Sequence, residues 1–141
     1  VNSFIKDILK LRITAPPAIP ACFSKNTKVS LSNRVTKNIS DLEIGDVLMD
    51  NGTVTGIMKL SPKHQDVYVL HGIVVTGNHS VYHDSLGWIP VEEHPNSLIV
   101  NEFDDNFVYC VNTDTKTITL GNTVFADWDD IDEIDLLISG L

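Results

Sequence analysis

The stretch DVYVLHGIVVTGNHSVYH, residues 66–83, decides how most of the chain is to be interpreted. Its apolar runs are short and β-branched, and turn-forming residues break them at His71-Gly72 and again at Gly77-Asn78. Runs of this length bounded by glycine and asparagine are typical of antiparallel strands rather than helices. We therefore predict two strands around the His71-Gly72 turn.

The same pattern of short apolar runs separated by turn residues extends from Cys22 to Asp127. The run TKVSL alternates Val29 and Leu31 with polar neighbours, and Asn51-Gly52 is the strongest hairpin-turn signal in the chain. Further short runs follow toward the C-terminus: GWIPV, SLIV, FVYCVNT, TITLG and NTVFAD. These patterns predict an all-β domain over residues 22–127 without crossover helices.

The two ends have a different composition. Residues 3–12 place apolar side chains at mostly helical spacing, and the Pro-rich segment that follows acts as an extended tether up to Ala21. At the other end, the acidic segment 128–141 repeats apolar residues at steps of three and four, which predicts an amphipathic helix. The expected organisation is an upstream helix and tether over 1–21, the β domain, and a C-terminal helix over 128–141.

The opposite charges of these two terminal segments allow two interpretations. The N-terminal segment is basic and the C-terminal segment is acidic. We favour helices that pack on a face or edge of the β domain. The alternative is an association surface for a partner protein.

The composition of the 141 residues excludes several function classes. The net charge of −9 makes binding to nucleic acid through a broad basic face unfavourable. No apolar run approaches the roughly 20 residues of a membrane span, and no signal peptide is evident at the start, so we expect no membrane partner. The spacing of cysteines and histidines does not match a zinc site, and we predict neither a metal nor a cofactor. The localisation stays undetermined.

Cys22 stands where the tether ends and the β domain begins. A thiolate is the strongest nucleophile among the side chains, and the nearest electrophile is the carbonyl of Ala21. Attack there passes through a five-membered ring and gives a thioester, provided that the peptide nitrogen is protonated as it leaves. This placement predicts an N-to-S acyl shift at the Ala21–Cys22 bond.

The turn that follows the apolar strand can supply the missing groups. His79 can donate a proton to nitrogen and take one back, and the Thr76 hydroxyl can hold the scissile amide or the imidazole. The Asn78 amide can donate to the developing oxyanion, although an asparagine chosen for turn geometry explains it equally well. A histidine that merely forms hydrogen bonds near a turn is the alternative for His79.

Several segments in order resemble the Hint family, the domain shared by inteins and hedgehog autoprocessing proteins. They are ACFSKNTKVSL, ISDLEIGDVL, the Thr-Gly-Asn-His segment and, more loosely, GWIPVEE and VYCVNT. The resemblance covers about residues 21–127. It implies a pseudo-twofold, horseshoe-like β fold whose termini lie close together. It also implies that Cys22 performs the acyl shift with help from Thr76 and His79, and that the upstream polypeptide is the substrate.

The pattern departs from the family at the C-terminal boundary. Splicing inteins end in asparagine followed by Cys, Ser or Thr, whereas this chain has Asp127 followed by Trp128, and Lys116 where a histidine is common. Splicing with a degenerate boundary at Asp127 remains an alternative to N-terminal cleavage. The position of the hedgehog carboxylate base corresponds to Met58 or Lys59, so water or a small thiol or amine is the expected acceptor.

Two further residues are candidate modulators. Cys110 lies at or next to a position where many family members carry an acid or a cysteine. It is either a buried core thiol or a thiol that pairs with Cys22 and switches it off. Asp114 is a candidate acid near the site. Two other function classes stay open: a Hint-like structural or interaction module without efficient chemistry, and a conventional cysteine hydrolase.

Overall fold

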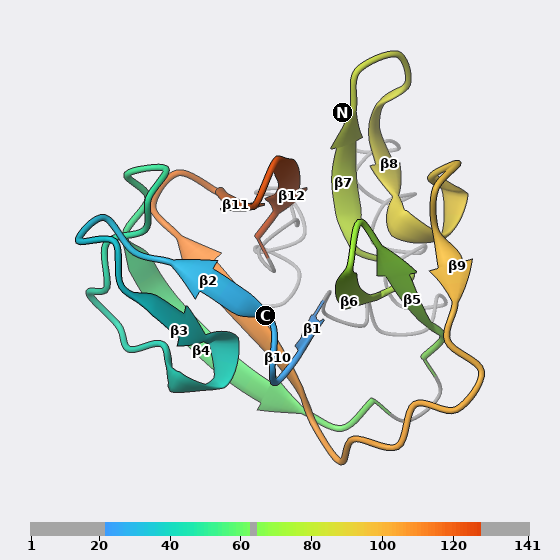
Figure 1. Ribbon diagram of the computed structural model, residues 1–141, viewed down its shortest axis with the longest axis horizontal. Coiled ribbons are helices and arrows are strands. Elements are labelled where there is room, and N and C mark those ends of the chain that lie inside the picture. Colours follow the sequence, from blue (N-terminus) through green and yellow to red (C-terminus); the bar gives the residue numbers. More distant parts are fainter. Residues whose placement is uncertain (1–21, 63–64, 128–141) are drawn as a thin grey trace, which may run out of the picture. The chain divides into compact units, whose positions relative to one another are not determined.

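The computed structural model describes residues 22–62 and 65–127. The two terminal helices predicted from the sequence, the Pro-rich tether and Ala21 lie outside the described residues, which Figure 1 draws in grey.

The described chain is built from short β-strands, which confirms the all-β prediction. Its only helical elements are the 3₁₀ turns η1 (Ile39–Asp41) and η2 (Val91–Glu93). Within the described residues, no helix has the length and apolar character needed to cross a membrane. The strands are β1 (Phe23–Ser24), β2 (Lys28–Ser30), β3 (Thr36–Asn38), β4 (Val54–Leu60), β5 (Val67–Leu70), β6 (Ile73–Thr76), β7 (Ser80–His83), β8 (Gly87–Pro90), β9 (Leu98–Ile99), β10 (Val108–Thr113), β11 (Thr117–Leu120) and β12 (Thr123–Ala126).

The strands form three sheets (Figure 1). The largest has the order β4-β10-β1-β6-β5-β9, the second has the order β11-β12-β7-β8, and β2 pairs with β3. All strand pairs in these sheets are antiparallel. The two-residue strand β1 therefore lies between two strands that come from distant parts of the chain. This central position brings the start of the domain beside β6 and β10.

The predicted His71-Gly72 turn joins β5 to β6 directly. Both turn residues have positive φ, 52° for His71 and 78° for Gly72, as expected for the tight turn whose twist matches antiparallel strands. Residues 66–83 contain a third strand, β7, that the sequence pattern did not separate from its neighbours. Only Val81 of β7 is buried, so the strand carries too little apolar alternation to be recognised.

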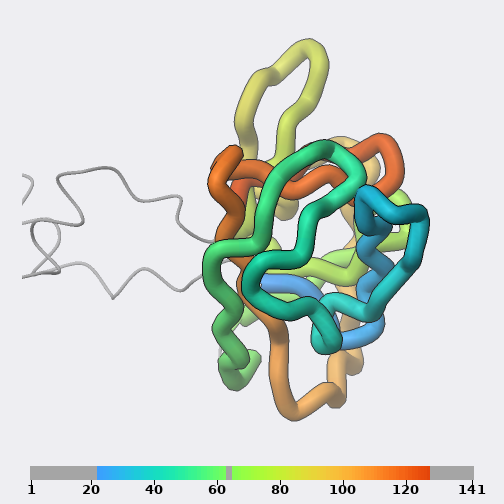
Figure 2. The backbone as a smooth tube through the Cα atoms, turned by 90° about the vertical axis from the view of Figure 1, so that its left-hand side faces the viewer, coloured from blue at the N-terminus to red at the C-terminus, as the bar shows by residue number. Residues whose placement is uncertain are grey.

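The apolar core connects the sheets. Phe23 of β1 and Phe125 of β12 are fully buried and meet edge to face, with ring centroids 5.0 Å apart. The remaining members come from most of the strands and from both 3₁₀ turns: Val29, Leu31, Ile39, Leu42, Leu48, Val54, Leu70, Val75, Val81, Val91, Val111, Ile118 and Leu120. The hairpin of β7 and β8 projects from the rest of the domain (Figure 2).

The Gly45-Asp46 motif stabilises its own turn. Gly45 has a φ of 97°, which favours glycine, and the Asp46 carboxylate accepts hydrogen bonds from the Glu43 backbone N–H at 2.9 Å and from Lys37 Nζ at 3.0 Å. The Glu43 N–H, together with Lys37, lowers the pKa of Asp46 below its usual value. Asp46 therefore has a structural role in this turn.

Candidate active site

Cys22 is held against the end of β6 by two hydrogen bonds. Its backbone N–H donates to Thr76 Oγ1 at 2.9 Å, and its carbonyl accepts from the Thr76 backbone N–H at 2.9 Å. Cys22 and Thr76 are both fully buried. Of the two partners that the sequence left open for the Thr76 hydroxyl, the structure gives it the nitrogen of the bond expected to break.

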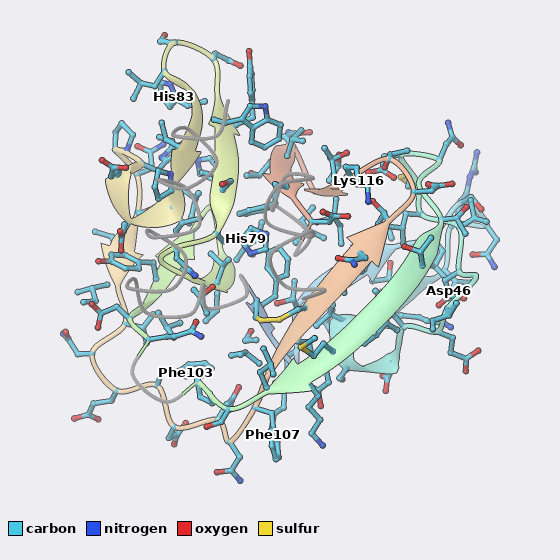
Figure 3. The ribbon with its side chains drawn as sticks, turned by 180° about the vertical axis from the view of Figure 1, so that it is seen from behind. Asp46, His79, His83, Phe103, Phe107 and Lys116 are labelled. Atoms are coloured by element: carbon cyan, nitrogen blue, oxygen red, sulfur yellow. A yellow bond between two sulfur atoms is a disulfide. The ribbon has the colours of Figure 1, made fainter. Side chains whose placement is uncertain are left out.

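The other side of Cys22 faces β10. Phe23 pairs with Tyr109 and Ser24 with Val108, so the same register places Cys22 opposite Cys110. The two Cα atoms are 4.4 Å apart and the two sulfurs form a disulfide, drawn as a yellow bond in Figure 3. Cys110 is therefore a paired cysteine and not a free core thiol.

An apolar cluster surrounds this disulfide. Both cysteines have no exposed surface, and they pack with the buried Val108. Three partly buried side chains complete the cluster: Met58, Leu60 and Phe103. Met58, one of the two residues that the sequence offered at the position of the hedgehog base, pairs with Cys110 across β4 and β10 and forms part of this apolar cluster.

The turn from Thr76 to His79 is closed tightly. The His79 N–H donates to the Thr76 carbonyl at 3.1 Å, and Gly77 bonds through its backbone to Asp66 and Glu92. A Cβ at Gly77 would lie 2.6 Å from Cε1 of Tyr68, closer than carbon atoms approach one another. Only glycine fits here, and its absence of a side chain lets the turn pack against Tyr68.

His79 lies between two aromatic rings and the end of β12. Its ring centroid is 4.5 Å from that of Phe23 and 5.5 Å from that of Phe125, and 1% of its surface is exposed. His79 Nε2 is 2.6 Å from the carbonyl oxygen of Ala126, which fixes the orientation of the imidazole. Figure 3 labels His79 in the interior of the domain. The imidazole thus touches the strand β1 that follows Cys22 and the residue that precedes Asp127.

Asp127 is buried and held at both its main chain and its side chain. Its Oδ2 accepts from the Thr113 N–H at 3.1 Å, and its own N–H donates to the Lys116 carbonyl at 3.0 Å. Only 1% of its surface is exposed. The contact that Lys116 makes with Asp127 comes from its main chain, where a positive φ of 66° turns the strand connection.

Two of the candidate residues lie outside this cluster of side chains. Asn78 is exposed on the turn, between the buried Gly77 and His79. Asp114 is exposed just after β10, where its Oδ1 accepts from the Thr53 N–H at 2.9 Å. The structure brings together Cys22, Thr76, His79, Cys110 and Asp127, whereas Asp114 holds a hairpin connection.

Three histidines gather elsewhere on the domain. The ring of His94 lies 5.4 Å from that of His71 and 5.1 Å from that of His83, and its Nδ1 accepts from the Asn96 N–H at 3.0 Å. Burial, and then the charges of His71 and His83, lower the pKa of His94. Across residues 22–62 and 65–127, no three His, Cys, Asp or Glu side chains are placed to hold a metal ion.

This arrangement gathers three residue types that carry nucleophilic and acid–base chemistry in proteins. They are the sulfur of Cys22, the hydroxyl of Thr76 on the Cys22 nitrogen and the imidazole of His79. The buried position excludes water from these groups and so strengthens the polar contacts among them. The disulfide to Cys110 occupies the sulfur.

Solved structures with the same architecture identify the fold. The chain resembles the gp41-1 intein at 13% identity, with a TM-score of 0.60 over 77% of this chain and 100% of that chain. The described domain has the Hint fold. No family model and no curated protein sequence matches the chain.

Two further Hint domains are similar over comparable lengths. A DnaB intein from Synechocystis sp. PCC 6803 is 15% identical, with a TM-score of 0.55 over 76% of this chain and 98% of that chain. A bacterial intein-like domain from Clostridium thermocellum is 16% identical, with a TM-score of 0.57 over 78% of this chain and 99% of that chain. At identities this low, the likeness is one of fold. This structural likeness confirms the resemblance to the Hint family that the sequence motifs indicated.

Sequence reasoning missed two participants in this Hint domain. The partner of His79 Nε2 is the backbone carbonyl of Ala126, and a backbone atom leaves no mark in the residue type. Phe125 packs its ring against His79 and Phe23, and its only signal was an aromatic residue at an inward position of the run NTVFAD.

Proposed function

We propose that the domain is a single-turnover self-processing domain that performs an N-to-S acyl shift at the Ala21–Cys22 bond. The observation that carries this proposal is the hydrogen bond from the Cys22 N–H to Thr76 Oγ1, in a Hint fold whose first strand begins at that cysteine. A hydroxyl on this nitrogen is useful only if the nitrogen takes part in the chemistry or in the local fold. Comparison of Thr76→Ser with Thr76→Val separates these roles.

The step begins with the Cys22 thiolate. Its sulfur attacks the carbonyl carbon of Ala21, and the carbon–nitrogen bond of the peptide then breaks. The electron pair of that bond goes to the nitrogen, which takes the proton that the thiol released on ionising and becomes the free amine of Cys22. The product is a thioester between the Ala21 acyl group and the Cys22 sulfur.

Thr76 and His79 have separate roles in this proposal. The Thr76 hydroxyl orients the scissile amide and can pass a proton to its nitrogen. His79 supplies a titratable group at the end of the same turn, one that the rings of Phe23 and Phe125 hold in place. General acid–base help of this kind accelerates such a step by about 10²–10⁴-fold.

The thioester is resolved by hydrolysis, or by transfer to a small thiol or amine. Asp127 differs from the asparagine that splicing inteins use, and its carboxylate is engaged by the Thr113 N–H. The residue that follows it, Trp128, offers no side-chain nucleophile. We therefore propose N-terminal cleavage without splicing, which leaves the upstream polypeptide as the substrate.

Intact-mass spectrometry of the reduced chain over a day tests this proposal. A phosphine keeps the cysteines reduced, and hydroxylamine captures any thioester as a hydroxamate. We expect a species of residues 22–141 together with a fragment that ends at Ala21, and we expect neither with Cys22→Ala. Thr76→Ser keeps the hydroxyl and should retain cleavage, whereas Thr76→Val, which has a similar shape, should lose it.

The outcomes separate the two function classes. An unchanged mass for the reduced chain, while Cys22→Ala and Thr76→Val remain folded, would mean that the domain is an inactive Hint-like module. Equal cleavage by Thr76→Val and Thr76→Ser would leave the self-processing activity in place and remove Thr76 from its mechanism.

A further inference from the structure

We propose that the Cys22–Cys110 disulfide is a reversible redox lock on the nucleophile, so that the domain can process itself only after a thiol or dithiol reductant has opened the bond. This inference rests on the proposed function, because it concerns the regulation of the same cysteine.

The sheet brings the two cysteines together without adjustment of the backbone. Cys22 directs both its N–H and its carbonyl toward Thr76 on β6. In an antiparallel sheet, a residue that bonds to one neighbouring strand through both groups faces the other neighbour as a non-hydrogen-bonded pair, with Cα atoms about 4.5 Å apart. The Cys22–Cys110 distance of 4.4 Å matches this geometry and lies at the short end of the range for disulfides.

The lock removes only the nucleophile. In the disulfide the Cys22 sulfur is bonded to Cys110 and carries no thiolate electron pair with which to attack Ala21. The Cys22 N–H nevertheless stays on Thr76 Oγ1, and His79 stays between Phe23 and Phe125. The contacts around Cys22 are therefore already in place, and reduction of the disulfide is the one change that the proposed reaction still requires.

Opening the lock is a balanced two-electron step. A reductant thiolate attacks one sulfur of the disulfide and forms a mixed disulfide, and a second thiol of the reductant displaces it. Two electrons and two protons pass from the reductant, which becomes a disulfide, to leave thiols on Cys22 and Cys110. Thiol exchange of this kind needs access to a sulfur, which the apolar cluster of Val108, Met58 and Phe103 restricts.

The short first strand offers a route for that access. β1 contains only two residues, so although it lies between β10 and β6, its local opening breaks few backbone hydrogen bonds. The core around Phe23 opposes this opening. We therefore expect slow reduction by a small thiol and faster reduction when mild denaturant loosens β1.

The test compares the full chain with Cys110→Ala in both redox states. Each protein is equilibrated in buffers of oxidised or reduced glutathione and then cleared of glutathione. The cleavage rate is measured with hydroxylamine by intact mass, with a phosphine added only to the reduced samples. We expect the oxidised wild-type chain to show the background rate of Cys22→Ala, and the reduced chain to cleave. Cys110→Ala molecules whose intact mass shows no glutathione bound to Cys22 should cleave at one rate in both states.

A second variant guards against a folding defect. Cys110→Val fills the position with a side chain suited to a buried strand, and it should reproduce the redox independence of Cys110→Ala. Alkylation of free thiols before mass measurement reports whether the bond forms, since the oxidised wild-type chain should take up no label at Cys22 or Cys110.

The outcomes distinguish this inference from the proposed function. Equal cleavage by oxidised and reduced wild-type chain, or two labelled thiols in every oxidising buffer, overturns the lock and leaves self-processing intact. If neither the reduced chain nor the Cys110 variants cleave, self-processing fails and the lock fails as its regulator, while the labelling still shows whether the bond forms.

Discussion

The two ends of the β domain, at Cys22 and at Asp127, are both buried, yet their polar contacts differ in kind. At Cys22, a side-chain hydroxyl contacts the main-chain nitrogen, and the side-chain sulfur is bonded to Cys110. At Asp127, a backbone N–H of Thr113 engages the side chain, and the main-chain nitrogen donates to a carbonyl. The first end carries the reaction in our proposal, and the contacts of the second anchor the last strand.

His79 connects the two ends. Its ring packs on Phe23, the residue after Cys22, and its Nε2 contacts the carbonyl of Ala126, the residue before Asp127. A change at His79 should therefore affect both ends, whereas a change at Thr76 or Asp127 should affect one.

The disulfide should cause the largest difference in stability between the two ends, because only Cys22 is cross-linked to another strand, through Cys110 of β10. It closes a loop of sequence separation 88, and chain entropy then predicts a stabilisation of about 4–5 kcal/mol. We expect a phosphine to lower the free energy of unfolding by this order in urea titrations. The Cys110→Ala variant should show no response to the phosphine, and an equal response there would separate the effect from the disulfide.

Replacement of His79 should cost most in rate. We expect His79→Gln to slow the release of the fragment ending at Ala21 by about 100-fold or more, since glutamine can bond to the Ala126 carbonyl but cannot exchange a proton near neutral pH. The rate is measured on reduced protein by intact mass, and two-dimensional NMR checks the fold. A fully retained rate in a folded variant would remove His79 from the chemistry and leave it as a link between the ends.

Gly77→Ala should disturb the turn that carries Thr76 and His79. The added Cβ meets Tyr68 Cε1 at 2.6 Å, and overpacking of this kind costs about 1–3 kcal/mol. We expect a lower denaturation midpoint and slower cleavage together. Gly56→Ala is the matched control, because its nearest contact is an ordinary 3.5 Å to Asn112 Cβ, and it should change stability by less than about 0.5 kcal/mol.

Asp127→Ala tests the anchoring role of the second end. It leaves the buried Thr113 N–H without its carboxylate partner, which costs about 1–3 kcal/mol of stability, and the rate of cleavage at Cys22 should stay unchanged. Asp114→Ala removes an exposed carboxylate that also accepts a backbone N–H, so it serves as the control with a smaller cost. A rate loss with Asp127→Ala alone would give Asp127 a part in the chemistry.

The smallest effect should come from His94, remote from both ends in its contacts. Its folded-state pKa lies below the ordinary value of about 6.5, so the unfolded chain binds more protons, and stability is lost as the pH falls through about 6.5 toward the lowered pKa. Urea titrations at several pH values should show this slope. His94→Asn keeps an acceptor for the Asn96 N–H without titrating there, and it should flatten the slope.

The sequence predicted the strands well where a turn-forming pair of residues stood next to a short apolar run. The His71-Gly72 turn and the Asn51-Gly52 turn both carry residues at positive φ, and the apolar runs on both sides of His71-Gly72 form β5 and β6 as expected. After Asn51-Gly52 the chain forms β4, whereas residues 46–50 before it make only isolated bridges. The sequence failed to separate β7, where one buried residue in four gives no readable alternation. Turn chemistry and burial of one face are local properties, so they leave a mark in the residue types.

The candidate site was predictable as a set of residue types. Cys22, Thr76 and His79 could be named because thiols, hydroxyls and imidazoles suit the chemistry that we propose, and because their order along the chain resembles that of Hint domains. The assignment of Asp114 to the neighbourhood of the site had only its distance along the sequence behind it. The structure places that residue in a hairpin connection with Thr53.

By itself, then, the sequence determined an all-β domain that starts at a cysteine, with a hydroxyl and an imidazole on one turn. Only the tertiary structure decided which atoms meet. The register of β1 against β10 sets Cys22 opposite Cys110, its pairing with β6 sets the Cys22 nitrogen on Thr76, and the approach of β12 gives His79 its carbonyl partner. These contacts join strands that lie far apart in the sequence. The packing of the whole core fixes how such strands pair, so the residue types that meet do not reveal the pairing by themselves.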